Sequence, residues 1–115
     1  ITAEALTLAQ KLDLDLNVFK EVNAGTTANN GQFHINFMSK VLKNDTKPGF
    51  TIDLAHKDMG LAIEAGNNFR VGLPVGSSVH AVYSQARSSD YSKKDFSALL
   101  DYSCELAGVK PPRIK

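Results

Sequence analysis

A charged pair inside an amphipathic segment is the feature of this sequence whose residue types could do chemistry. The segment from Lys47 to Glu64 reads KPGFTIDLAHKDMGLAIE and contains the adjacent residues Lys57 and Asp58. A lysine ammonium carries three hydrogen-bond donors and a full positive charge, so it can bind the oxygen atoms of a ligand. One interpretation is therefore that Lys57 projects over a ligand that approaches the backbone at Gly60.

A helix must position this pair. Pro48 and Gly49 interrupt any preceding structure, and the Thr51 hydroxyl can cap a first turn, so the sequence predicts a helix that begins at Thr51 or Ile52. Three-and-four spacing predicts one buried face, made of Ala55, Met59, Ala62, Ile63 and Gly66. A neighbouring stripe holds Asp53, Lys57, Gly60, Leu61 and Glu64. Lys57 is thus expected beside the core and not within it.

Spacing alone leaves a second interpretation open, and favours it. Asp53 and Lys57 are four residues apart, which on a helix permits an ordinary exposed ion pair worth about 0.2–0.5 kcal/mol. A glycine inside a helix costs roughly 1 kcal/mol relative to alanine. Gly60 would then be explained by a closely packed neighbouring helix and not by a ligand.

The rest of the chain has helical patterns throughout. Helices are expected over 1–12, from near Asp15 to residues 23–25, over 32–42, from Pro74 to about Arg87, and over 96–106, besides the one that carries Lys57. The helix that carries Lys57 is expected to end at Asn67 and Asn68. No window indicates several strands, and no repeat of 20–50 residues is present. The predicted fold class is all-α.

Composition narrows the function classes. A length of 115 residues suits one domain and is long enough for a single core. A net charge of +1 gives no reason to expect a nucleic acid partner, and no apolar run is long enough to cross a membrane, so a cytoplasmic location is expected. Cys104 has no partner for a disulfide, and the three histidines lack the spacing of a metal site, so no metal is expected.

The segment around Lys57 resembles the C-terminal signature of the β-hydroxyacid dehydrogenase family, which includes 3-hydroxyisobutyrate dehydrogenase, tartronate semialdehyde reductase and sulfolactaldehyde reductase. The usual form is K-D-L-G-x-A-x-D, and residues 57–64 read KDMGLAIE. EALTLA near the start and YSKKDFSALL near the end extend the resemblance over nearly the whole chain. It implies that residues 1–115 are a single all-α C-terminal domain, a helical bundle like the C-terminal domain of 6-phosphogluconate dehydrogenase.

The resemblance also implies an activity for the intact protein. Members use NAD or NADP to transfer a hydride to or from a small 3-hydroxy acid or its semialdehyde, as tartronate semialdehyde reductase and 3-hydroxyisobutyrate dehydrogenase do. This chain lacks a G-x-G-x-x-G turn, so the cofactor-binding Rossmann domain is expected upstream. The family's catalytic lysine is expected upstream too, and Lys11, Lys20 and Lys57 do not replace it. The fragment alone is therefore expected to be inactive.

Three residues match positions near the family's active site. Lys57 matches the lysine that closes over the cofactor, Phe50 matches an aromatic residue that borders the site, and Asp58 matches the acid beside the lysine. Asp58 could fix Lys57 or only cap and pair locally, and structural support of the site is the preferred role. Asp95 matches the start of the terminal helix, where a capping role suffices. The implied partners are the protein's own Rossmann domain, a small hydroxy acid or semialdehyde, and further copies in a dimer or tetramer.

A different functional class remains open. The helical scaffold could serve as a non-enzymatic association module that keeps the dehydrogenase fold without its reaction. The upstream sequence distinguishes the two, because an enzyme needs a dinucleotide fingerprint and a catalytic lysine there. A helical DNA-binding domain is disfavoured by the near-zero net charge and by the lack of a basic recognition helix.

Overall fold

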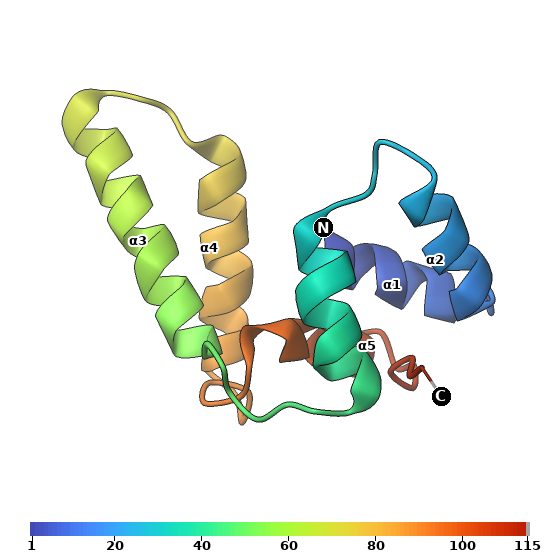
Figure 1. Cartoon of the computed structure of the whole chain (residues 1–115). Helices are drawn as coiled ribbons and strands as arrows, with labels where there is room; N and C mark the ends of the chain where they lie inside the picture. Colours follow the sequence, from blue (N-terminus) through green and yellow to red (C-terminus); the bar gives the residue numbers. More distant parts are fainter. Residues whose placement is uncertain (115) are drawn as a thin grey trace. The chain divides into compact units, whose positions relative to one another are not determined.

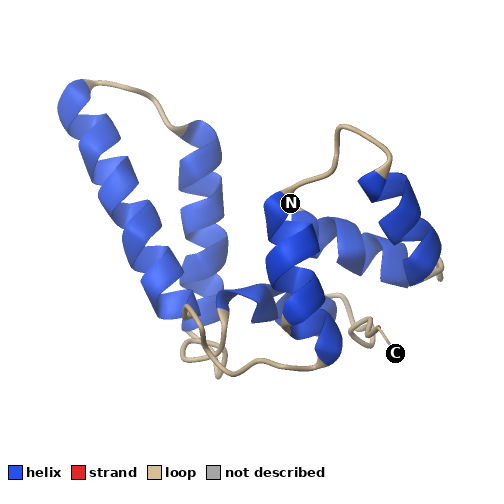
Figure 2. Cartoon of the chain, in the orientation of Figure 1, coloured by secondary structure: helices blue, strands red, loops and turns tan. Residues whose placement is uncertain are grey.

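The computed structural model describes residues 1–114, and its regular structure is helical apart from one isolated antiparallel bridge between Thr51 and Asp95 (Figure 2). The prediction of an all-α chain is confirmed for these residues. They group into two compact units. Unit 1 contains residues 1–47 together with the chain from 97 onward, and unit 2 contains residues 48–96.

Unit 1 has the larger apolar core. Its helices are α1 (Thr2–Lys11), α2 (Leu16–Ala24), the π-helical segment η1 (Gln32–Phe37), the 3₁₀ turn η2 (Val41–Lys43) and α5 (Leu99–Leu106) (Figure 1). A cluster of buried side chains joins them: Ala3, Leu6, Phe33, Phe37, Val41, Leu42, Leu100 and Cys104. The 3₁₀ turn η3 (Phe96–Ala98) leads into α5. Burial of this cluster is the main source of order in unit 1.

The predicted helix over residues 32–42 is present in a different form. Residues 32–37 are π-helical, and Lys40 leaves the helical conformation before the short turn η2 begins. Phe33 and Phe37 are both buried, at 0% and 5% exposure. Apolar spacing predicted a helix here but did not distinguish α from π turns, because either one can bury these two rings.

Unit 2 is an antiparallel pair of helices, α3 (Ile52–Phe69) and α4 (Pro74–Arg87), which lie side by side in Figure 1. The Thr51 hydroxyl accepts a hydrogen bond from the Leu54 amide at 3.1 Å, so the predicted cap of α3 is confirmed. Pro74 occupies the first turn of α4, as expected for a residue that lacks an amide hydrogen. The local signals therefore located both helix starts.

The far end of α3 differs from the prediction. The helix continues past Asn67 and Asn68 to Phe69, and Arg70 then adopts a left-handed conformation with φ of 57°. The Val71 amide donates to the Gly66 carbonyl at 2.8 Å, which closes the helix end. The chain returns so closely here that a methyl group on Gly66 would lie 2.8 Å from Leu73 Cδ1 and 2.9 Å from the Val71 carbonyl oxygen.

The buried face of α3 is narrower than predicted. Ala55 and Gly66 are buried and Met59 and Ile63 are half-buried, whereas Ala62 is exposed. Within the described part of unit 2, α3 packs against the single helix α4. One neighbouring helix covers a narrow stripe, so the edge of the predicted apolar face stays in solvent.

Candidate functional site

The lysine and aspartate of the signature segment form an ion pair on the outer side of α3. Lys57 Nζ lies 2.9 Å from Asp58 Oδ1, and the two side chains are 59% and 53% exposed. An ion pair this exposed contributes only about 0–1 kcal/mol. A ligand oxygen can therefore compete for the ammonium group, and Asp58 is placed to limit the positions that the ammonium takes.

The alternative pairing of Lys57 with Asp53 is not what the structure shows. Asp53 Oδ1 accepts from Arg87 Nε at 3.1 Å, and Asp53 Oδ2 accepts from Lys93 Nζ at 2.8 Å. The hydrogen bond from Lys93 is the main reason that the pKa of Asp53 lies below its ordinary value, with Arg87 adding to the effect and burial opposing it. The interpretation of an Asp53–Lys57 pair was wrong because residues from α4 and the following loop reach Asp53.

Gly60 faces α4. A methyl group added there would lie 3.4 Å from Nε2 of His80, a residue of α4. The space beside Gly60 is thus occupied by the neighbouring helix. Of the two interpretations of this glycine, helix packing is supported and a ligand at the backbone is not.

Two histidines stack beside the signature segment. The rings of His56 and His80 have centroids 4.0 Å apart and planes inclined by 28°. Arg87 Nη1 lies 3.0 Å from His56 Nδ1, and because a guanidinium can only donate, the imidazole nitrogen accepts. Burial, then His80 and Arg87, lowers the pKa of His56 from its ordinary value. His56 therefore links α3 to α4 through its neutral form.

Phe50 stands at the entrance to α3, on a segment that the chain around residues 92–96 holds in place. Its ring is 37% exposed and meets Phe96 edge to face, with centroids 5.9 Å apart. Asp95 Oδ2 accepts hydrogen bonds from the amides of Gly49 at 3.0 Å and Phe50 at 3.3 Å. Asp95 is only 2% exposed. Its contact with residues 49 and 50 was missed, because the sequence suggested only a local cap for the next helix.

The predicted site residues all belong to unit 2. Phe50 lies just before α3, and Lys57 and Asp58 lie on α3. The described contacts join Lys57 to Asp58 and Phe50 to Phe96, and they do not join the two groups directly. The arrangement offers one exposed cation and one half-exposed aromatic ring, which is a contact surface and not a complete catalytic centre.

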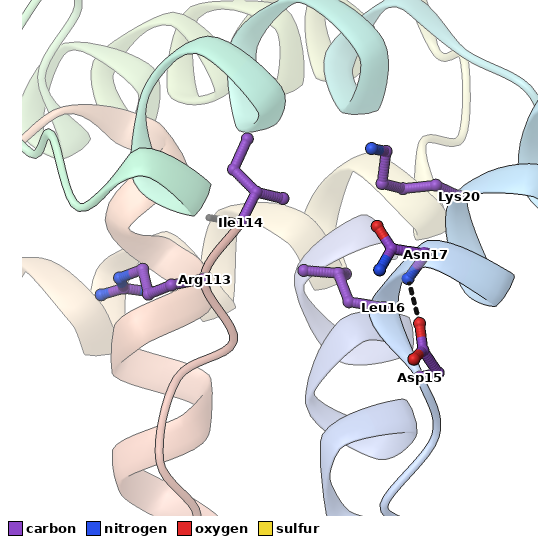
Figure 3. Close-up of a pocket in the computed structure, with 6 residues that line it drawn as sticks. All are labelled: Asp15, Leu16, Asn17, Lys20, Arg113 and Ile114. Carbon is purple, nitrogen blue, oxygen red and sulfur yellow. Dashed lines mark hydrogen bonds between the residues drawn. The ribbon is translucent and has the colours of Figure 1, made fainter.

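Unit 1 has its own hollows, and none of the predicted site residues lines them. One has a volume of about 410 Å³ and lies between the start of α2 and the C-terminal segment (Figure 3). Its charged lining residues are Asp15, Lys20 and Arg113, and Arg113 already donates to Asp101 Oδ2 at 2.8 Å. A larger, mainly apolar groove of about 610 Å³ lies beside Leu14, Val18 and Val22.

Residues 1–114 support neither a metal centre nor a reactive thiol. This part of the chain has no group of three or more His, Cys, Asp or Glu side chains that could hold a metal ion. Cys104 is buried, and burial raises the pKa of its thiol, which disfavours the reactive thiolate. Within the same residues, no helix is both long and apolar enough to cross a membrane.

Comparison with known proteins identifies the family. Residues 1–103 match the model of the family described as NAD-binding of NADP-dependent 3-hydroxyisobutyrate dehydrogenase. The chain belongs to this family. It is 40% identical to a 3-sulfolactaldehyde reductase of Escherichia coli over 109 residues, which cover 95% of this chain and 37% of that protein.

A solved structure with the same fold supports the assignment. The structure of Mycobacterium tuberculosis 3-hydroxyisobutyrate dehydrogenase with L-serine superposes with a TM-score of 0.78 and 34% identity, over 87% of this chain and 36% of that one. A 3-hydroxyisobutyrate dehydrogenase from Salmonella typhimurium gives the same TM-score at 30% identity, over 87% of this chain and 35% of that one. The chain thus spans little more than a third of the length of these relatives.

Proposed function

We propose that this chain is the C-terminal domain of an NAD(P)-dependent dehydrogenase or reductase that acts on a small 3-hydroxy acid or its semialdehyde. The observation that carries the proposal is the family match over residues 1–103, together with 40% identity to a 3-sulfolactaldehyde reductase. The intact protein would have its own N-terminal Rossmann domain. Its helical domain would share the fold of the 6-phosphogluconate dehydrogenase C-terminal domain and contribute to a dimer or tetramer.

Lys57 is the residue that we assign to the cofactor. The Lys57 side chain is 59% exposed and its partner Asp58 holds it weakly, so its charge and its hydrogen-bond donors can reach a ligand. Oxygen atoms of a phosphate, a ribose or a nicotinamide amide are suitable acceptors for such a donor. One cation cannot bind a whole dinucleotide, so most of the cofactor contacts would come from the Rossmann domain. Phe50 and Asp58 would support the site.

The cofactor, this chain and the upstream part of the protein would have different roles in the reaction. A nicotinamide cofactor, when bound, supplies or accepts the hydride. This chain would contribute an aromatic border that limits access of water and a cation that holds the cofactor in register with the substrate. The acid–base lysine would lie in the part of the protein that precedes this chain. The fragment is accordingly expected to be inactive without it.

A steady-state assay of the full-length protein tests the proposal. NADH and NADPH would each be combined with sulfolactaldehyde, tartronate semialdehyde, methylmalonate semialdehyde and succinic semialdehyde. We expect turnover of one aldehyde with a preference for one cofactor, and sulfolactaldehyde is the first to test because of the 40% identical relative. A folded protein that neither turns over these aldehydes nor binds a dinucleotide would instead favour a non-enzymatic association module.

A further inference from the structure

The buried carboxylate of Asp95 contacts the backbone of Phe50, the aromatic residue of the candidate site. Asp95 is 2% exposed, and its Oδ2 accepts from the amides of Gly49 and Phe50, which precede it by 46 and 45 residues. The Phe96 amide donates to the Phe50 carbonyl at 2.7 Å. Both backbone polar groups of Phe50 are therefore held by Asp95 and the residue that follows it.

The same connection continues into the first turn of α3. Thr51 and Asp95 form an antiparallel bridge, the Ile52 amide donates to the Lys94 carbonyl at 3.1 Å, and the Asp53 amide donates to the Ser92 carbonyl at 3.1 Å. These amides at the start of a helix have no partner within the helix. Residues 92–96 thus supply acceptors that set where α3 begins.

The charge of Asp95 strengthens this attachment. Hydrogen bonds from amides to a carboxylate are stronger than those to a neutral acceptor. Removing a carboxylate from water is unfavourable, so a buried one is retained only where such donors compensate. A local cap of the following helix would not require contact with residues 49 and 50. The long-range contact instead fixes the backbone from which the Phe50 ring projects.

We propose that Asp95 is a positioning residue for the active site, whose carboxylate holds the backbone of Gly49 and Phe50, just before α3, at the substrate-facing border. This inference rests on the proposed function, because it assigns Phe50 to that border. Asp95 acts through Phe50 and does not touch the substrate. Loss of its charge loosens the aromatic border while leaving the α3–α4 hairpin folded.

Kinetics of the full-length enzyme test this role. Asp95→Asn should raise KM for the aldehyde about tenfold and change kcat less than about threefold, as expected when ground-state and transition-state binding weaken together. Asp95→Glu keeps the charge and should recover part of the loss. Asp90→Asn is the matched control, since Asp90 is an exposed residue of the neighbouring loop, and it should leave KM unchanged.

A double-mutant cycle separates positioning from a general structural role. In a Phe50→Leu background, Asp95→Asn should raise KM further by less than about twofold, because residues that act as a unit are not additive. Effects that multiply would overturn the proposal. So would an Asp95→Asn enzyme that is merely less stable, with unchanged kinetic constants while it is folded.

Hydrogen exchange gives a readout that does not depend on activity. In Asp95→Asn, a peptide spanning residues 47–54 should exchange faster, whereas a peptide spanning residues 67–74 should be unchanged. Unchanged exchange in the first peptide would overturn the role of Asp95 even in an active enzyme. A wild-type protein without turnover or dinucleotide binding would instead contradict the proposed function. Faster exchange of residues 47–54 in its Asp95→Asn variant would still assign Asp95 to holding Phe50.

Discussion

Unit 1 and unit 2 are each stabilised internally by a different kind of interaction. Unit 1 buries large apolar side chains completely, among them Phe33, Leu6, Leu42 and Leu100. The fully buried apolar residues of unit 2 are Ile52 and Ala86, and its most buried charged group is Asp95. Ion pairs of Asp53 with Arg87 and Lys93 join α3 to α4 and to the following loop in unit 2.

The interactions that contribute most to stability and the candidate site lie in different units. A large apolar side chain that is removed from water contributes about 1.5–3 kcal/mol, whereas an exposed ion pair contributes about 0–1 kcal/mol. Unit 1 therefore has the interactions that stabilise the chain most strongly. Unit 2, which carries Phe50, Lys57 and Asp58, has a smaller apolar core. Backbone hydrogen bonds hold its segments in position.

The largest effect is expected from the core of unit 1. Phe33→Ala removes a ring with 0% exposure and should lower the free energy of unfolding by about 3–5 kcal/mol. Phe69→Ala is the matched control in unit 2, because that ring is 80% exposed, and it should change stability by less than about 0.5 kcal/mol. Urea denaturation measures both. Similar losses of unfolding free energy for the two variants would contradict the conclusion that unit 1 has the most strongly stabilising interactions.

A smaller loss of stability is expected at the tip of unit 2. Gly66→Ala places a methyl group 2.8 Å from Leu73 Cδ1 and 2.9 Å from the Val71 carbonyl oxygen. The chain must shift to accept it, which should cost about 1–3 kcal/mol of unfolding free energy. Gly72→Ala is the control, because no atom lies within 4 Å of the added methyl. Equal unfolding free energies for the two variants would contradict the expectation that the chain near Gly66 leaves no room for a methyl group.

Lys57→Ala should affect ligand binding and not folding. If the full-length protein has the proposed activity, the substitution should raise KM for the dinucleotide about 10-fold to 100-fold, the effect of a lost hydrogen bond from a charged group. The unfolding free energy should change by less than about 0.5 kcal/mol, because the side chain is exposed. Steady-state kinetics and denaturation measure the two effects, with Lys93→Ala as an exposed lysine control. Unchanged cofactor kinetics in Lys57→Ala would remove this residue from the site.

The smallest effect concerns the histidine pair. Burial, His80 and Arg87 hold the pKa of folded His56 below its ordinary value of 6.5. The unfolded chain therefore binds more protons as the pH falls below 6.5, so the contribution of His56 to stability is present above that pH and is lost below it.

Thermal unfolding between pH 8 and pH 5 measures this contribution. The wild type should lose more stability over the acidic part of the range than His56→Gln does, because the variant has no imidazole to protonate. Parallel pH profiles for the two proteins would show that the contact between His56 and Arg87 is not sensitive to protonation.

Sequence reasoning worked best where the signal was local. Thr51 as a cap, Pro74 at a first turn and Asp15 before α2 were each recognised from their immediate neighbours, and the structure has helices at all three places. Each signal acts within three or four residues, which is the range over which helix ends form hydrogen bonds. The resemblance of residues 57–64 to a family signature likewise required no knowledge of contacts.

The errors came from contacts between distant segments. Asp53 was paired with Lys57 by spacing, but residues 34 and 40 positions away bind it in the structure. Spacing left two interpretations of Gly60 open, and His80 of α4, which lies beside it, supports helix packing. A periodic pattern does not specify which neighbouring helix supplies a partner. The assignment of Phe50, Lys57 and Asp58 to the site stays a prediction until the enzyme is assayed.

The sequence by itself determined the helical class, most of the helix starts and the family signature, because these depend on residue types at short and regular spacing. The tertiary structure decided which groups meet. Asp95 binds amides 45 and 46 residues before it, and α4 with the loop that follows it supplies the partners of Asp53, His56 and Gly60. The physical reason is that hydrogen bonds and ion pairs depend on distance in space, which only the packed chain establishes.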